Sequence, residues 1–196
     1  MTRIIAGAAG GTRLDVPGQG TRPTSDRVRE SLFGALESMD AIGNARVLDL
    51  YAGSGALGLE ALSRGARSAV LVERGRPAAA VIRRNVAAVR KALATSTDSD
   101  AGAREPTVVE SAVHAYLTRA TGPFDLVFTD PPYDLSDADM TADLVAVAPL
   151  LSSDAVVVIE RARRATPPDL GAAGLSLIRE RSYGDTALWW AEPSTR

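Results

Sequence analysis

Apolar and polar positions divide most of the chain into a regular series of short and long segments. From residue 46 onward, short continuous apolar runs are separated by longer segments whose apolar residues recur at helical spacing. These patterns predict strands at 46–50, 68–73, 107–109, 124–129 and 155–160, and helices at 56–64, 77–92, 112–119 and 137–150. Because the strands are apolar throughout, we expect a parallel sheet that is covered by helices on both faces, in an α/β fold.

The first residues of the chain have a different pattern. Residues 3–6 and 12–16 flank the turn signal Gly10-Gly11, which predicts a β-hairpin. A parallel sheet does not need this hairpin, so we expect it to be an extension of the main fold. The chain is therefore divided into a hairpin extension at 1–24 and one main domain at 25–196.

A helix is expected at the start of the main domain, from about Ser25, which is a good N-cap residue. Helical spacing predicts one apolar face for this helix, made by Val28, Leu32, Ala35, Leu36 and Met39. Arg27, Arg29 and Glu30 lie off that face, and we expect them to be outside the core.

The end of the chain predicts a second hairpin. Residues 175–181 and 186–192 flank a turn at 183–185, and they are expected to close the sheet as an antiparallel pair. Trp189 and Trp190 are consecutive in a strand, so they face opposite sides of the sheet, and at least one should lie in the core. The polar stretch 95–105 has few apolar residues and is expected to be a mobile loop.

Composition removes several classes of chemistry. The chain has no cysteine, which excludes disulfides and thiolate catalysis and is compatible with a cytoplasmic location. Its one histidine, His114, argues against a histidine-rich metal site or a histidine-based triad, and we expect no bound metal. This histidine is expected to be a surface or packing residue. No apolar run approaches the length of a membrane span, so we expect no membrane partner.

The charge is distributed unevenly. Net charge is −2 and only one of the 22 basic residues is a lysine, but arginines are concentrated in the first 34 residues. Arginine suits phosphate and base contacts better than lysine does, so this cluster is a candidate nucleic-acid surface. The candidate residues are Arg3, Arg13, Arg22 and Arg27. The alternative is that the hairpin only caps the sheet and that its arginines face water. Arg161, Arg163 and Arg164, by contrast, are expected to be a solvated charge run.

A glycine-rich loop follows the first parallel strand and opens a helix. Gly53, Gly55 and Gly58 have the spacing G-x-G-x-x-G, and Glu73 ends the next strand. Glycines in such a loop permit a tight turn and close approach of a ligand, and the acid can bind the two hydroxyls of an adenosine ribose. The pattern predicts a site for an adenosine cofactor. The alternative is a glycine turn that serves only the packing of helix against strand.

Asp49 distinguishes between adenosine cofactors. A dinucleotide places its pyrophosphate at the start of the helix, where a carboxylate just before the loop would repel it. S-adenosylmethionine has no phosphate, and it carries a sulfonium and an ammonium group. The sequence therefore favours S-adenosylmethionine. The candidate cofactor-binding residues in and beside the loop are Asp49, Tyr51, Ala52, Gly53, Gly55, Glu73 and Arg74.

The tetrapeptide Asp130-Pro131-Pro132-Tyr133 follows the buried run 124–129 and is the candidate catalytic site. Its prolines end regular strand pairing, which leaves a rigid bend between a carboxylate and an aromatic ring. The carboxylate and a nearby backbone carbonyl can accept hydrogen bonds from a planar exocyclic amine, while the ring stacks on the base. The alternative is a proline-rich turn with an aromatic residue at the edge of the core.

These motifs resemble those of a known family. The segment 47–58, Glu73 and the tetrapeptide at 130–133 resemble the nucleotide amino-methyltransferases of the Rossmann-like, S-adenosylmethionine-dependent class. The segment 22–33, RPTSDRVRESLF, is similar to that of the bacterial 16S ribosomal RNA guanine-N2 methyltransferases. The likeness extends over nearly the whole chain, although the polar stretch 95–105 looks long for the family.

The resemblance implies several further properties. It implies a doubly wound sheet of seven strands whose last strand is antiparallel, and adenosine contacts near Ser111 and Ala112. It implies methyl transfer to the N2 amine of one guanine in 16S ribosomal RNA, within a partly or fully assembled small subunit. Thr24, in the segment that enters the domain, is expected to contact cofactor or RNA. We expect the protein to act as a monomer.

Three other functions stay open on the sequence alone. A DNA methyltransferase acting on adenine N6 or cytosine N4 uses a similar tetrapeptide, although the chain has little room for a target-reading domain. A dinucleotide oxidoreductase shares the glycine loop, but Asp49 and the tetrapeptide disfavour it. A non-catalytic RNA-binding assembly module is a third alternative that would retain the fold, yet the glycines and Asp130 are intact.

Overall fold

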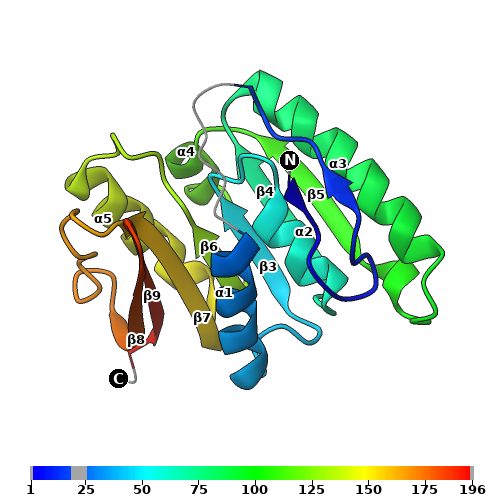
Figure 1. Ribbon diagram of the computed structural model, residues 1–196. Coiled ribbons are helices and arrows are strands. Elements are labelled where there is room, and N and C mark those ends of the chain that lie inside the picture. Colours follow the sequence, from blue (N-terminus) through cyan, green and yellow to red (C-terminus); the bar gives the residue numbers. More distant parts are fainter. Residues whose placement is uncertain (1, 19–25, 195–196) are drawn as a thin grey trace.

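The computed structural model describes residues 2–18 and 26–194. Its centre is a seven-stranded sheet with the order β5-β4-β3-β6-β7-β9-β8 (Figure 1). The strands are β3 (Arg46–Leu50), β4 (Ser68–Glu73), β5 (Glu105–Glu110), β6 (Phe124–Thr129), β7 (Leu151–Ala162), β8 (Leu175–Tyr183) and β9 (Thr186–Pro193). The strands from β5 to β7 are parallel, and β9 runs antiparallel to both of its neighbours. This confirms the doubly wound sheet and its antiparallel last strand.

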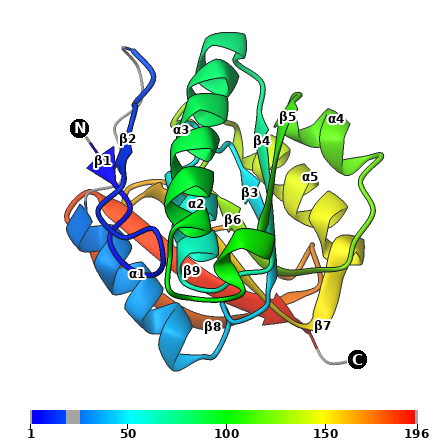
Figure 2. The ribbon, with the colours of Figure 1, turned by 90° about the vertical axis from the view of Figure 1, so that its right-hand side faces the viewer.

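Helices cover both faces of the sheet, as the apolar strands predict. They are α1 (Asp26–Ser38), α2 (Ala56–Ser63), α3 (Arg76–Ala94), α4 (Val113–Leu117) and α5 (Asp137–Val147), with short 3₁₀ turns at Ala101–Ala103 and Ala148–Leu150. One core cluster joins α1, α2 and α3 to Val47, and the other joins α4 and α5 to Leu48. Because consecutive strand residues face opposite sides, these helix groups lie on opposite faces (Figure 2).

Trp189 and Trp190 belong to these two different clusters. The predicted division between opposite faces is thus confirmed, and both tryptophans are buried, which agrees with the expectation of at least one in the core. The two residues therefore fix β9 between the core layers, near the edge of the sheet.

The N-terminal hairpin is confirmed, with strands shorter than predicted. Strands β1 (Thr2–Arg3) and β2 (Arg13–Leu14) form a separate two-stranded sheet. Ile4, Ala9 and Leu14 are buried in the same core cluster as α1 and α2. The hairpin and the main domain therefore share apolar packing, while the predicted boundary at residue 24 lies outside the described residues.

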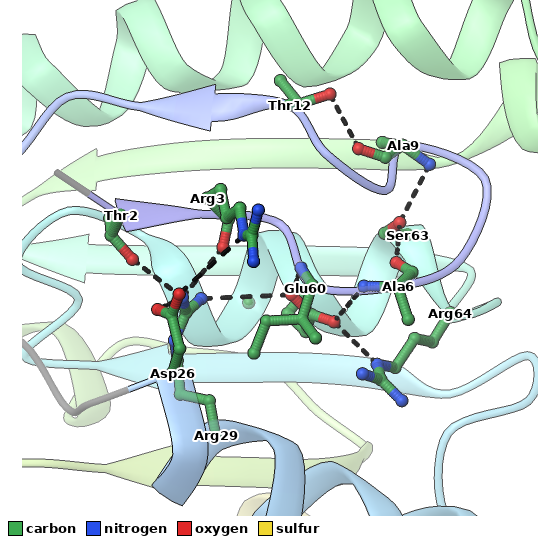
Figure 3. Close-up of polar contacts among 12 residues, drawn as sticks. Thr2, Arg3, Ala6, Ala9, Thr12, Asp26, Arg29, Glu60, Ser63 and Arg64 are labelled. Carbon is green, nitrogen blue, oxygen red and sulfur yellow. Dashed lines mark hydrogen bonds and ion pairs between the residues drawn. The ribbon is translucent and has the colours of Figure 1, made fainter.

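Polar contacts also join the hairpin to α2 (Figure 3). Glu60, which is fully buried, accepts hydrogen bonds from the backbone N–H groups of Ile5 (2.7 Å) and Ala6 (3.0 Å). Gly7 has a φ of +84°, and a Cβ there would lie 2.1 Å from the Ser63 carbonyl oxygen. Only glycine permits this close approach of the hairpin backbone to the helix.

The prediction that Arg29 lies outside the core is wrong. Its side chain is 1% exposed, and its Nη2 donates to Thr2 Oγ1 (2.7 Å), Arg3 O (2.8 Å) and Asp26 Oδ1 (2.7 Å) (Figure 3). Its Nη1 lies 3.9 Å from Glu60 Oε2, which compensates the buried charge. Helical periodicity could not show this, because the hairpin covers a second face of α1.

The structure corrects the expectation for one polar segment and shows how a second is attached. Arg161 is not part of a solvated run, because its side chain is 9% exposed and its Nη1 lies 2.7 Å from Asp137 Oδ1. In the polar stretch 95–105, Ala101 is fully buried. Arg104 donates from this stretch to Leu62 O (2.9 Å), so a specific side chain holds the loop against α2.

None of the helices in the described ranges is long and apolar enough to span a membrane.

Candidate active site

A cavity of about 540 Å³ lies at the carboxyl ends of the central parallel strands. The sheet order runs outward through β4 and β5 on one side of β3, and through β6 and β7 on the other. The junction of β3 and β6 is thus the point where strand order reverses, which is where doubly wound sheets bind ligands. Both predicted motifs contribute to the walls, because Gly53 comes from the glycine loop and Asp130 from the tetrapeptide.

The three glycines of the loop have different structural roles. Gly53 lines the cavity with a φ of +57°. Gly55 faces the core instead, where a Cβ would lie 2.9 Å from Leu71 Cδ2. Gly58 lies against Asp49, and its N–H donates to Asp49 Oδ2 at 2.9 Å. The loop therefore combines one glycine at the cavity with two that permit close packing behind it.

Asp49 is a buried carboxyl group in the wall of the cavity, with 2% exposure. Burial raises its pKa to about 7, and the charge of Glu73 acts in the same direction, while the hydrogen bond from Gly58 opposes the shift. A cation in the cavity would favour the ionised form of this group. The site is therefore suited to a positively charged ligand.

Glu73 connects the glycine loop to the segment after β4. Its Oε2 accepts from the Gly53 N–H at 3.1 Å, and its Oε1 accepts from the Gly75 N–H at 2.7 Å. A carboxylate has about four acceptor positions, so both oxygens can also accept from a pair of ribose hydroxyls. Arg74 follows it at the cavity wall with an exposed side chain.

Tyr51 is held in an unusual backbone conformation beside the cavity. Its φ is +60°, and its hydroxyl donates to Asp143 Oδ2. Asp143 Oδ1 lies 3.1 Å from His114 Nδ1, so one buried carboxylate of α5 joins the loop to α4. Burial and this carboxylate raise the pKa of Tyr51. His114 is a largely exposed partner of Asp143, as expected of a surface residue.

The tetrapeptide places its four residues in different environments. Asp130 lies in the wall of the cavity, while the Tyr133 side chain at the rim is 69% exposed. The Leu135 N–H donates to the Pro132 carbonyl oxygen at 3.0 Å and closes a turn after the prolines. Burial raises the pKa of Asp130 well above its usual range, and the charges of Glu160 and Asp49 add to this effect.

Sequence reasoning missed Glu160 as a site residue. It lies in β7, is 9% exposed, and lines the same cavity as Asp130. Thr129 and Ile159 are partners in the parallel pairing of β6 and β7, so Asp130, just beyond β6, lies beside Glu160, which is still within β7. The available signal was an acid at the end of the predicted strand 155–160.

The N-terminal part of the chain also supplies one wall, which the sequence did not indicate. Thr2, Val16, Pro17 and Arg29 are among the residues that line the cavity. The N-terminal extension therefore lines the same cavity as the glycine loop.

The remaining predicted residues lie around the cavity or outside the described ranges. Ser111 and Ala112 are not among the residues that line it, although the Ser111 N–H donates to the Glu73 carbonyl oxygen at 3.0 Å. Arg3 and Arg13 are exposed and directly opposed in the hairpin, and Arg27 is exposed on α1. The predictions for Thr24 and Arg22 concern residues outside the described part of the chain.

The sheet with its antiparallel last strand, the glycine loop and the tetrapeptide at one cavity define a Rossmann-like methyltransferase. A family model described as "Conserved hypothetical protein 95" matches residues 2–192. Ribosomal RNA small subunit methyltransferase D of Escherichia coli K12 is 37% identical over 186 residues, which are 94% of this chain and 86% of that protein. The chain therefore belongs to the family that includes ribosomal RNA small subunit methyltransferase D, as its sequence motifs predict.

Solved structures agree with this assignment. The structure of yhhF from Escherichia coli is 33% identical, with a TM-score of 0.80 over 100% of this chain and 99% of that chain. The magnesium protoporphyrin IX methyltransferase ChlM of Synechocystis, solved with bound SAH, is 14% identical. Its TM-score is 0.67 over 89% of this chain and 90% of that chain, which is a likeness of fold.

Proposed function

We propose that this chain transfers a methyl group from S-adenosylmethionine to the exocyclic N2 amine of a guanine in 16S ribosomal RNA. The single observation that carries the proposal is the meeting of the glycine loop and Asp130 in one cavity, at the point where strand order reverses. The family relationship supports the ribosomal RNA substrate, because a relative with 37% identity is named a ribosomal RNA small subunit methyltransferase.

The cavity wall on the β3 and β4 side fits the cofactor. Glu73 is positioned by two backbone N–H groups and would accept hydrogen bonds from the ribose hydroxyls. Asp49 favours a cationic ligand and would repel a pyrophosphate, which disfavours a dinucleotide at this loop. Gly53, Tyr51 and Ala52 would supply backbone contacts along the same wall. S-adenosylmethionine supplies an activated methyl group.

The wall at β6 fits the methyl acceptor. Guanine would have to leave its stack, and Tyr133, with its exposed ring, would replace the lost stacking. Asp130 and a backbone carbonyl of the tetrapeptide would accept the two hydrogens of the N2 amine and direct its lone pair toward the cofactor side. Pro131 and Pro132 fix the bend that brings these acceptors together.

The charge and proton changes of the reaction match the position of Asp130. As the N–C bond forms and the S–C bond breaks, positive charge develops on the guanine nitrogen, and the adjacent carboxylate stabilises it. A proton then passes from this nitrogen to Asp130, which leaves a neutral methylated amine. The raised pKa of Asp130 makes its carboxylate an effective proton acceptor.

The RNA surface proposed here lies at the N-terminal hairpin. Arg3 and Arg13 are cross-strand neighbours with exposed side chains, and Arg27 is exposed on the adjoining helix. The hairpin also forms one wall of the cavity through Thr2 and Val16, so RNA bound there would be close to the reacting centre. We further propose that the substrate is a partly or fully assembled small subunit in the cytoplasm, and that the protein acts as a monomer.

A parallel methylation assay tests this function. Naked 16S RNA, assembled small subunits and duplex DNA are incubated with the protein and S-adenosylmethionine, and the products are analysed as nucleosides and mapped to a position. We expect N2-methylguanosine at one position of 16S RNA. Methylated adenine or cytosine in DNA would instead establish a DNA methyltransferase. Binding of NAD in preference to S-adenosylmethionine would overturn the cofactor assignment.

A further inference from the structure

The proposed reaction gives no role to Glu160, an acid that lines the cavity. Glu160 lies beside Asp130 because the parallel pairing of β6 with β7 ends at Thr129 and Ile159, the residues that directly precede these two acids. Both side chains line the same cavity, and Glu160 is 9% exposed. Two acids that line one cavity place neighbouring hydrogen-bond acceptors in its wall.

The edge of guanine that carries the N2 amine matches a pair of carboxylates. Guanine presents its N1–H beside the N2 amine, so two neighbouring groups are hydrogen-bond donors. Adenine presents one amine beside an unprotonated ring nitrogen, and cytosine does the same. Enzymes that act on an unstacked base recognise it through hydrogen bonds to this edge. A row of acceptors therefore complements guanine and opposes the other two bases.

We propose that Glu160 accepts a hydrogen bond from N1–H of the target guanine while Asp130 accepts one from the N2 amine, so that this carboxylate pair selects guanine. The proposal rests on the proposed function, because it takes the N2 amine as the methyl acceptor. With adenine or cytosine, the lone pair of a ring nitrogen would face an ionised carboxylate without a proton between them. The desolvated carboxylate would then have no hydrogen-bond donor, and the resulting free-energy cost would disfavour binding of adenine or cytosine.

The surroundings of the pair support a role in recognition. Burial and, after it, the charge of Glu160 raise the pKa of Asp130, in agreement with the neighbouring positions of the two acids. Arg29 also lines this cavity, and its buried guanidinium is compensated by Asp26 and Glu60. A base with two donors would stabilise both carboxylates in their ionised forms.

A base analogue tests this role with the unaltered protein. 2-Aminopurine retains the 2-amine but lacks N1–H and has an acceptor in its place. Small subunits are reconstituted from ligated 16S RNA in which the mapped target guanine is replaced by 2-aminopurine, and single-turnover methylation is measured at about pH 8.5. The wild-type protein should methylate the analogue roughly 10- to 100-fold more slowly, as expected for loss of a hydrogen bond to a charged acceptor.

The variant Glu160→Gln distinguishes recognition from intrinsic reactivity of the analogue. Glutamine can accept from N1–H of guanine or donate to N1 of 2-aminopurine, so the preference for guanine should fall by about tenfold or more. Glu180→Gln is the matched control, because Glu180 is exposed on β8 and the change is the same. Glu160→Ala is made in parallel as a second variant, and the ratio of the two substrates is the readout in each case.

Two results would overturn the proposal. Equal rates of the wild-type protein on guanine and 2-aminopurine would remove any need for an acceptor at N1. An unchanged preference in both folded Glu160 variants would assign selection to another residue. Failure of the wild-type protein to methylate the guanine substrate itself would instead contradict the proposed function. The two failures are therefore separable.

Discussion

Asp49 is a buried acid and Asp130 a half-buried acid at the cavity, and their surroundings assign them different partners. Asp49 accepts a hydrogen bond from the Gly58 N–H in the wall beside the glycine loop, whereas Asp130 lies beside a second acid, Glu160. A carboxylate beside a cationic cofactor and a carboxylate beside a donor-rich base are the two requirements of amine methylation. Each acid therefore yields a separate prediction.

Replacing Asp49 with asparagine should stabilise the free protein at high pH and weaken cofactor binding. A carboxyl group whose folded-state pKa is raised to about 7 lowers stability as pH rises from about 4 to about 7, because the folded state holds the proton more tightly than the unfolded state. The variant should avoid this decrease in the free energy of unfolding, which is at most about 4 kcal/mol. Thermal unfolding of the variant and of the wild-type protein at pH 5 and at pH 8 measures the difference. The account fails if the variant and the wild-type protein differ equally at both values.

The rate of methyl transfer should rise with pH through the pKa of Asp130, since only the ionised group accepts the amine hydrogens. Glu160→Gln removes a charge that raises this pKa, so the acid limb of the rate profile should move to lower pH. Other ionisable or charged residues at the cavity are Asp49, Tyr51, Glu73, Asp134, Tyr133, Arg29 and Arg74. The control variant Glu180→Gln should leave the acid limb of the rate profile at its wild-type pH. If the limb also stays at that pH in Glu160→Gln, the charge of Glu160 does not influence the ionisation of Asp130.

At the scale of elements, strands β3, β4 and β6 match the sequence prediction residue for residue. Their apolar runs are bounded by glycine, proline or charged residues, so local patterning is sufficient to identify them. The position of Arg29 could not be predicted in the same way. Its burial depends on the hairpin packing over α1, which is a contact between segments that periodicity does not describe.

The cluster formed by Arg29, Glu60 and the hairpin backbone should make a large contribution to stability. Glu60→Gln removes a fully buried charge that compensates Arg29 and accepts from Ile5 and Ala6. We expect a loss of about 3–5 kcal/mol in the free energy of unfolding, measured by urea denaturation. Amide exchange at residues 5 and 6 should also become faster.

The control for this variant is Glu37→Gln, at the exposed end of the same network. Glu37 pairs with Arg64 at 2.6 Å, and its side chain is 53% exposed, so its loss should cost less than about 1 kcal/mol. Equal losses in the two variants would show that the buried cluster has no special role in attaching the hairpin.

The hairpin arginines should contribute to RNA binding. In the double variant Arg3→Ala and Arg13→Ala, loss of two phosphate contacts should weaken RNA binding and reduce the log–log salt slope by about two. Cofactor affinity should change little, because these exposed side chains are not among the residues that line the cavity. Filter binding across a salt series measures the first effect and calorimetry the second. Wild-type values in both would place the RNA surface elsewhere.

At the scale of the whole molecule, the order of the strands determines the site. The sequence predicts the glycine loop, the tetrapeptide and the acid after β4, because each motif is local. It does not specify that β6 lies between β3 and β7, and this order alone brings Glu160 beside Asp130. The wall that the hairpin supplies through Val16 and Pro17 likewise results from tertiary packing.

The most direct test of the central claim is single-turnover methylation of small-subunit RNA by the wild-type protein and by Asp130→Ala. The product measured is N2-methylguanosine, and calorimetry with S-adenosylmethionine checks that the variant retains its cofactor site. We predict that the wild-type protein forms this nucleoside and that the variant is slower by at least about 100-fold at near-normal cofactor affinity. A rate in the variant within about threefold of wild type would contradict the account.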